Sequence, residues 1–344
     1  MKLFVSWIII VLCVSCGGNM IKNPPEDFST SIRITPQRIL DLGDFEILQP
    51  HKVIKYKNQY VFFDAYKNNG CVKFMSESTK IVSGVREGNG PLEIIGACGF
   101  AVIEDSVFLM DYNHRKLLSV YPEKDSLIVK VSSNNSYVGM RSYPITKNRF
   151  LETSSYDSCM YSLKTLDNQT LTRINYPEDK VLDAFAPSIQ NTIYVNTKFT
   201  VSPDKKHYAW GVMCTAKYGF GRIINNDLIT LDTVLSYSPL KIQKIVKMKS
   251  SEVIRPTDDS KMNILACTSS SKYAMFLYCG TGYADIKNHF GKKILLYTWE
   301  GKPKKVIEVD ENLVTIDYDD EKNILYGISM NPEAQLVEYN FNEI

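Results

Sequence analysis

The stretch SVFLMDYNHRKLLSVYPEKDSLIVKV, residues 106–131, decides the fold. It contains three short runs that suit β-strands, at 107–111, 116–121 and 127–131, separated by polar turns at 113–114 and 122–125. Strands that are joined by two to five turn residues, with no helical period between them, form an antiparallel meander. The stretch therefore predicts three consecutive strands of one sheet.

The same hairpin recurs along the whole chain. The first strands are expected at 60–64, 107–111, 149–153, 208–212, 273–278 and 324–328, and their partners at 71–75, 116–121, 160–164, 219–224, 293–298 and 335–339. A period of about 40 to 50 residues, with one four-stranded sheet per unit, is the signature of a β-propeller. Six units predict six blades, and the two longest spacings predict insertions at 225–237 and 241–261.

The two ends of the chain complement each other. The last unit stops at Ile344 after three predicted strands, whereas residues 31–42, SIRITPQRILDL, supply strand-like material ahead of the first unit. Because an open sheet edge invites aggregation, the N-terminal strand is expected to complete the last blade and close the ring. The predicted fold is an all-β, six-bladed propeller over residues 31–344, and only residues 242–253 suit a short helix.

The N-terminus has the pattern of an export signal. Lys2 precedes a ten-residue apolar stretch, which is too short to span a bilayer. The small residues before Cys16 resemble a bacterial lipobox, which implies a signal peptide at 1–15, acylation of Cys16 and a Gly- and Pro-containing tether at 16–30. The alternative is an ordinary secretory peptide that is cleaved nearby. We expect a lipid anchor in the inner or outer membrane, with the domain in the periplasm or at the cell surface.

The composition and net charge indicate a globular protein that does not bind nucleic acid. Of the 344 residues, 44% are hydrophobic, which indicates a globular chain, and the net charge is only +2. Both signs are interspersed, so no field favours nucleic acid. The sequence holds one basic cluster, for which a solvated loop or strand face is expected rather than a phosphate site. Its members are Lys241, Lys244, Lys247 and Lys249. We expect a monomer that contacts the membrane only through its lipid.

Six cysteines remain after processing, and their disulfide state is left open by the sequence. They are Cys71, Cys98, Cys159, Cys214, Cys267 and Cys279. None forms a C-x-x-C pair, so neither zinc nor thioredoxin-type chemistry is indicated, and no cofactor is expected. If residues 269–271 form a hairpin turn, Cys267 lies opposite a residue near Phe276, which would leave Cys267 and Cys279 unbridged.

Three segments resemble one known family. Residues 88–94, GNGPLEI, look like the Gly-x-Gly-Pro-Gly-Glu-Phe element of TolB-like six-bladed β-propeller lipoproteins of the Bacteroidetes, with Leu92 and Ile94 departing from it. Residues 201–206, VSPDKK, resemble the Ser-Pro-Asp-Gly-Lys turn of that family with Lys205 in place of Gly, and residues 294–341 resemble its last two blades. The resemblance covers residues 31–344 and implies fold and envelope location, but it brings no catalytic residues.

Several polar residues could serve either a structural role, such as forming a turn, or a functional role, such as binding a ligand. The Gly88-Asn89-Gly90 loop lacks the following helix of a phosphate site, so a turn between blades is expected. The four histidines occur without a metal-binding spacing. Asp64, Asp111 and Asp317 hold related places after apolar runs, where they either cap turns or converge to bind a cation or to act as acid and base.

Ligand-binding residues are expected on loops that the rigid sheets hold. Most candidates fall in the turn after a unit's first hairpin strand, and repeat geometry should bring these turns to one face. Tyr283 is expected to fall outside this position. The candidates are Asp111, Tyr112, His114, Arg115, Tyr156, Asp157, Tyr218 and Tyr283. The favoured function is a binding or scaffolding module for a glycan, a peptide or an envelope protein. The alternative is a metal-assisted lyase or hydrolase at the channel mouth.

Overall fold

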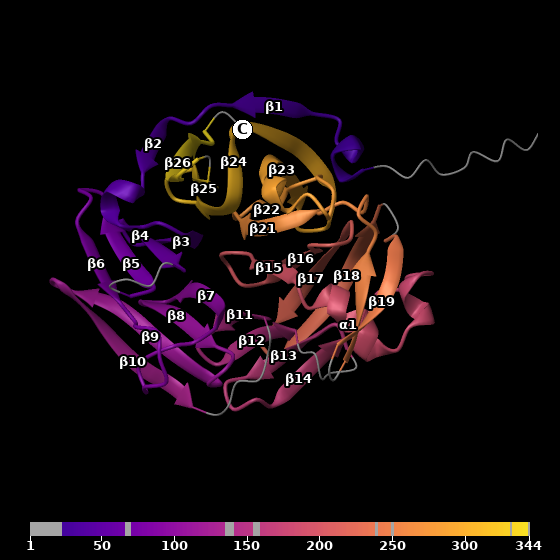
Figure 1. The fold of residues 1–344 in the computed structure, drawn as a ribbon, viewed down its shortest axis with the longest axis horizontal. Coiled ribbons are helices and arrows are strands. Elements are labelled where there is room, and N and C mark those ends of the chain that lie inside the picture. The colour runs from indigo at the N-terminus through magenta and orange to yellow at the C-terminus, as the bar shows by residue number, and fades with distance from the viewer. Residues whose placement is uncertain are drawn as a thin grey trace, which may run out of the picture.

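The hairpins predicted from the sequence form the middle of each sheet in the structure. The computed structural model describes residues 23–65, 70–134, 141–153, 159–237, 240–248, 251–330 and 332–342. Within them, the predicted first strands are the second strands of six blades. Viewed down its shortest axis, the molecule is a ring of blades whose inner strands surround a central axis (Figure 1). The prediction of an all-β, six-bladed propeller is confirmed.

Each of the first four blades is a separate four-stranded antiparallel sheet whose first strand lies innermost. Blade 1 contains β3 (Pro50–Tyr56), β4 (Gln59–Asp64), β5 (Val72–Ser76) and β6 (Ile81–Gly84). Blade 2 contains β7 (Ala97–Ile103), β8 (Ser106–Asp111), β9 (Lys116–Glu123) and β10 (Ser126–Asn134). Blade 3 contains β11 (Arg141–Thr146), β12 (Arg149–Thr153), β13 (Tyr161–Thr165) and β14 (Thr170–Ile174). Blade 4 contains β15 (Thr197–Val201), β16 (His207–Val212), β17 (Lys217–Ile224) and β18 (Leu228–Ser236).

The last two blades share one long strand. Blade 5 contains β21 (Ile264–Ser269), β22 (Tyr273–Tyr278), β23 (Gly291–Thr298) and the first part of β24 (Pro303–Asp319). The second part of β24 is the innermost strand of blade 6, where it pairs with β25 (Ile324–Met330), and β26 (Ala334–Asn340) follows. A single strand thus passes from the outer edge of one blade to the inner edge of the next.

The N-terminal segment closes the ring, as predicted. β2 (Arg38–Asp41) pairs antiparallel with β26 and supplies the fourth strand of blade 6. β1 (Ser31–Ile34) pairs in parallel with residues 306–309 of β24 and lies outside blade 5. One segment therefore covers the open edges of two neighbouring blades, which removes exposed pairing sites.

The hydrophobic core lies between adjacent blades. Val61 and Phe74 of blade 1 belong to the same buried cluster as Leu109 and Leu118 of blade 2. Between blades 3 and 4, the Trp210 indole N–H donates to the Tyr161 hydroxyl over 3.1 Å. Since each blade buries both of its faces against neighbours, the blades depend on one another for their stability.

Two expectations for the insertions are wrong. Residues 242–253 form no helix; β19 (Ile242–Met248) and β20 (Ser251–Pro256) make a hairpin there, because the β-branched residues of this stretch favour extended backbone. Residues 225–237 are no insertion, since they hold β18, the regular outer strand of blade 4. The extra length lies before blade 4 instead, in η3 (Leu182–Ala184) and α1 (Pro187–Tyr194).

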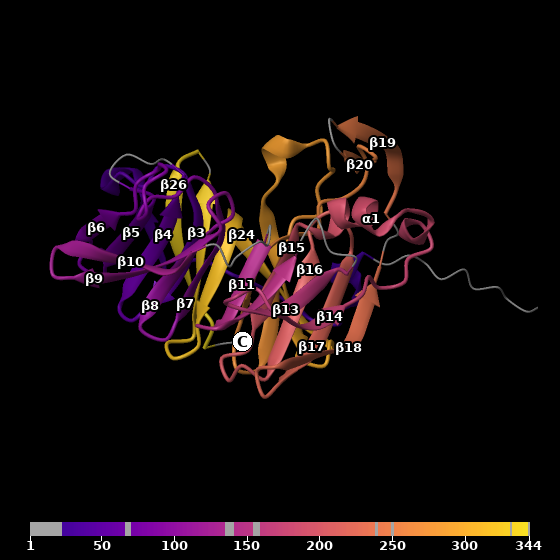
Figure 2. The same cartoon turned by 90° about the horizontal axis from the view of Figure 1, so that it is seen from below.

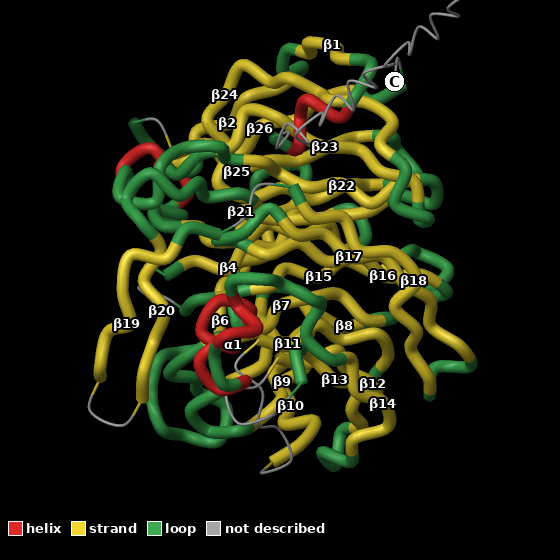
Figure 3. The backbone as a smooth tube through the Cα atoms, turned by 90° about the vertical axis from the view of Figure 1, so that its right-hand side faces the viewer, coloured by secondary structure: helices red, strands yellow, loops and turns green. Residues whose placement is uncertain are grey.

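Helices are few and short within the part of the chain that the structure describes (Figure 3). Three further 3-10 turns are η1 (Pro24–Asp27), η2 (Gly43–Phe45) and η4 (Ile286–Asn288). None of the described helices has the length and hydropathy that a membrane span requires.

The strand register around Cys267 follows the prediction. Cys267 of β21 pairs with Phe276 of β22, and Cys279 lies beyond the end of that hairpin. Cys267 and Cys279 are both free thiols in the structure, as is Cys214.

Candidate binding site at the mouth of the central channel

The starts of the inner strands and the longest connections lie on one face of the ring. In each blade the inner strand begins opposite the end of the second strand, as in the pairs Pro50 with Asp64, Ala97 with Asp111 and Ile264 with Tyr278. The connection after every second strand and the connection between successive blades therefore leave from this same face, which we call the loop face. α1, β19 and β20 stand above the strands on one side of the ring (Figure 2).

At the loop face the six inner strands surround a cavity of about 500 Å³. All six strands contribute to its wall. Its lining includes Lys52 of β3, Gly99 of β7, Arg141 of β11, Lys198 of β15, Cys267 of β21 and Thr315 of β24. This volume lies within the range of small-molecule sites, and such sites commonly combine an apolar wall with a few polar groups.

The charged groups that line the cavity are all basic. Lys52, Arg141 and Lys198 come from blades 1, 3 and 4, and His51 lies beside them. No Asp or Glu is among the described residues of the lining. Lys52 Nζ donates to the Phe100 carbonyl over 2.6 Å, which ties blade 1 to blade 2. The wall therefore presents an excess of positive charge to whatever enters.

Enclosure by protein shifts the pKa values of Lys198, Lys52 and Cys267. Burial lowers the pKa of Lys198 to about 8, and the neighbouring Arg141 acts in the same direction. Burial also lowers the pKa of Lys52, although Asp317 opposes that shift. For Cys267, burial raises the pKa to about 12, so this thiol is neutral at physiological pH. Such shifts arise because low-dielectric surroundings disfavour the charged form.

Asp317 holds the ring together near the axis. Its carboxylate accepts hydrogen bonds from the Lys55 amide of blade 1 over 3.0 Å and from the Thr268 hydroxyl of blade 5 over 2.9 Å. Burial raises the pKa of Asp317, and those two hydrogen bonds oppose the rise. This residue of blade 6 is thus a structural link between three blades, and it does not line the cavity.

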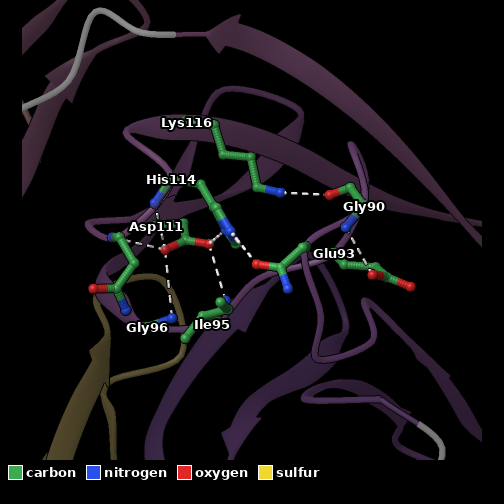
Figure 4. Close-up of polar contacts among 9 residues, drawn as sticks. Gly90, Glu93, Ile95, Gly96, Asp111, His114 and Lys116 are labelled. Carbon is green, nitrogen blue, oxygen red and sulfur yellow. Dashed lines mark hydrogen bonds and ion pairs between the residues drawn. The ribbon is translucent and has the colours of Figure 1, made fainter.

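The predicted turn around Asp111 is a polar network rather than an open site (Figure 4). The buried Asp111 carboxylate accepts from the backbone amides of Ile95, Gly96 and Asn113, and it contacts His114 Nδ1 at 2.8 Å. Burial raises the pKa of Asp111, but the Ile95 amide and the His114 contacts outweigh it and hold that pKa below its usual range. The turn-capping role expected for this carboxylate is therefore the one it has.

The glycine-containing loop at 88–94 connects β6 to β7, as expected of a turn between blades. The Gly90 amide donates to Glu93 Oε2 over 2.8 Å, and Lys116 Nζ donates to the Gly90 carbonyl over 2.8 Å (Figure 4). His114 Nε2 lies 2.9 Å from Asn89 Oδ1. A Cβ at Gly88 would meet the Glu93 carboxylate, so that flexible side chain would have to move for any other residue at this position.

Comparison with protein-family models decides the family. The model described as TolB-like 6-blade propeller-like matches residues 34–321, which is most of the chain. The chain belongs to the TolB-like six-bladed propeller family. Comparison with curated protein sequences finds no match.

Among solved structures, several propellers cover most of this TolB-like chain at very low identity. A protein of Bacteroides fragilis assigned as exported is 10% identical, with a TM-score of 0.49, covering 90% of this chain and 99% of its own. Luciferin-regenerating enzyme is 6% identical, with a TM-score of 0.48 and coverages of 88% and 95%. The β-propeller domain of Myceliophteria thermophila Cps50 (Swd1) is 8% identical, with a TM-score of 0.42 and coverages of 85% and 99%.

The structure separates the candidate site residues of this TolB-like chain. Tyr112, Arg115 and Tyr283 lie on the loop face, and Arg115 is exposed. Tyr283 follows β22, so it occupies the same place in its blade as the Asp111 turn, contrary to the prediction that it was an exception. Tyr156, Asp157 and Cys16 lie outside the described residues.

The prediction of Tyr218 as a ligand-binding residue is wrong, because its side chain is not available at the surface. It lies in β17, is fully buried, and packs edge-on against Phe276 with ring centroids 5.3 Å apart. The alternation of the strand points its ring into the core between blades 4 and 5. Lys217 is buried as well, and its ammonium lies 3.1 Å from an Asp179 carboxylate oxygen.

The cavity residues Lys52, Arg141 and Lys198 were missed from the sequence. Each stands within the first three residues of an inner strand, a place that the repeat marks once the second strands are known. A search for basic residues at equivalent repeat positions would have found this signal. Among the described residues, no group of three or more His, Cys, Asp or Glu is placed to hold a metal ion.

Proposed function

We propose that this TolB-like propeller is a binding module of the cell envelope whose ligand enters the cavity at the loop face. The observation that carries the proposal is the cavity itself, about 500 Å³ in volume and lined by all six inner strands. Rigid sheets position its wall, and long connections surround its mouth, which is the usual arrangement of a binding site on a repeat scaffold. A glycan, a peptide or a segment of an envelope protein fits this description.

Blocking the cavity is expected to abolish binding without unfolding the ring. Ala97 lines the cavity at the start of β7, so Ala97→Trp places a large ring inside it. The matched control is Asp105→Trp, at the opposite end of the same hairpin, where the replaced side chain is 90% exposed. The measurement is a thermal-shift screen of residues 23–344 against peptides and glycans, repeated on both variants.

A ligand that stabilises the native domain and Asp105→Trp, but no longer stabilises Ala97→Trp, supports the proposal. A ligand that binds Ala97→Trp as well as it binds the native domain would move the binding site elsewhere on the propeller. Circular dichroism of both variants checks that the strands remain.

Anchoring is the second part of the proposal. The lipobox-like residues before Cys16 and the tether to residue 30 support a lipid anchor on the mature N-terminus. Cys16→Ala is expected to block acylation and to release the domain from the membrane fraction, because one or two acyl chains supply the only expected membrane affinity. Fractionation of cells that express the full chain tests this, with Cys13→Ala as the control; unchanged partitioning of Cys16→Ala would refute the anchor.

A further inference from the structure

Three basic side chains face the same cavity from different sides of the ring. Lys52 belongs to blade 1 and Lys198 to blade 4, which are three blades apart and therefore opposite each other (Figure 1). Arg141 belongs to blade 3, next to Lys198. The propeller thus brings together cations that are up to about 150 positions apart in the sequence.

These cations have no carboxylate partner among the described residues. The interactions of Lys52 and Arg141 are with neutral oxygens, the Phe100 carbonyl at 2.6 Å and Asn196 Oδ1 at 3.4 Å. No hydrogen bond or ion pair joins Lys198 to another described residue. Asp317, the carboxylate that most affects the titration of Lys52, already accepts from Lys55 and Thr268.

The rest of the wall is largely apolar and aromatic. Phe63, Phe100, Tyr143 and Phe199 line the cavity beside the basic groups. Lys52 and Lys198 are partly withdrawn from water without a carboxylate partner, which is costly, whereas Arg141 is exposed at the rim. An incoming anion relieves that cost while forming charge-assisted hydrogen bonds. Aromatic rings beside the cations give an apolar body a surface on which to pack.

We propose that the cavity binds a small organic oxyanion, a carboxylate or phosphate carried on an apolar body, through Lys198 and Arg141 with Lys52 on the opposite wall. This inference rests on the proposed function, since it names the chemistry of the ligand that the module would bind. The guanidinium of Arg141 offers two parallel donors to an oxyanion, and the ammonium of Lys198 offers a point charge.

The affinity for an anion is expected to depend on pH. Since the pKa of Lys198 is about 8, its ammonium is present below that pH and is lost as the pH rises toward 9. The anion should therefore bind best near pH 7 and more weakly near pH 9. The other groups that act on Lys198 are Arg141, Cys267, Lys52 and Cys214. Burial raises the pKa of Cys214 to about 11, so this thiol stays neutral over that range.

The experiment uses three probes, the native domain and four variants. Benzoate, phenyl phosphate and the uncharged benzamide are titrated by calorimetry into residues 23–344 at low ionic strength and pH 7. The variants are Lys198→Met, Arg141→Gln and the control Lys147→Met, an exposed lysine at the opposite end of β11 that is paired with Glu104. Benzoate titrations are repeated at pH 9, also with His51→Gln, because His51 lines the cavity too.

Support consists of binding by one or both anions but not benzamide, weakened about tenfold or more by Lys198→Met and by Arg141→Gln but not by Lys147→Met. Which of the two anions binds more tightly distinguishes carboxylate from phosphate. The inference is overturned if neither anion binds at millimolar concentration, or if both are bound equally by Lys198→Met. In that case, a neutral ligand whose binding is blocked by Ala97→Trp would support the proposed binding function but not the preference for an anion.

Discussion

Asp64→Ala is expected to lower the free energy of unfolding by about 3–5 kcal/mol, because it removes one partner of a buried ion pair and leaves the charge of the other uncompensated. Lys73 Nζ lies 2.8 Å from Asp64 Oδ2, and the two side chains are 2% and 0% exposed. The carboxylate also accepts from the amides of Leu48 and Gln49 at the entry to blade 1. The substitution leaves a buried ammonium that donates only to the backbone carbonyl of Glu46 among the described residues.

Urea unfolding of residues 23–344 at pH 7 measures this loss. The matched control is Asp232→Ala, since Arg222 and Asp232 lie 2.7 Å apart on the surface, where a pair contributes little. The double variant Asp64→Ala with Lys73→Met should be more stable than Asp64→Ala alone, because it removes the stranded charge. A loss for Asp64→Ala no greater than that of the control would contradict the structural role assigned to the pair.

Removal of β2 is expected to abolish cooperative folding of the ring. A chain that begins at residue 43 lacks the outer strand of blade 6, the pairing of Leu40 with Leu336 and the fully buried side chain of Leu42. It also exposes the edge of β26, which a propeller otherwise keeps covered. Since Tyr60 of blade 1 donates to Glu338 of β26 over 2.6 Å, the loss reaches the interface between the last blade and the first.

The control is a chain that begins at residue 35, which lacks η1 and β1 but retains β2. It should still unfold in a single transition at a somewhat lower temperature, because Phe28, which packs 5.0 Å from Tyr297, is missing. Calorimetry and size-exclusion chromatography report the outcome. If both chains unfold alike, ring closure does not depend on β2.

The strands themselves were predictable because their signal is local. Alternation and turn residues predicted β12 and β22 at their observed bounds, and they predicted the other second strands to within two residues. The closing role of residues 31–42 followed from an edge that had to be covered. The helix α1 was missed because eight residues are too few for a helical period to emerge from a β-rich sequence.

The sequence by itself therefore determined the class of fold, the number of blades and the way in which the ring closes, since each depends on patterns within a hairpin or on the count of strands. Only the tertiary structure decided which side chains meet. It buried Tyr218 between blades 4 and 5, made Asp317 a link between blades, and placed Lys52, Arg141 and Lys198 around one cavity. These outcomes join residues from different blades, and the interactions within a single hairpin carry no information about contacts across the ring.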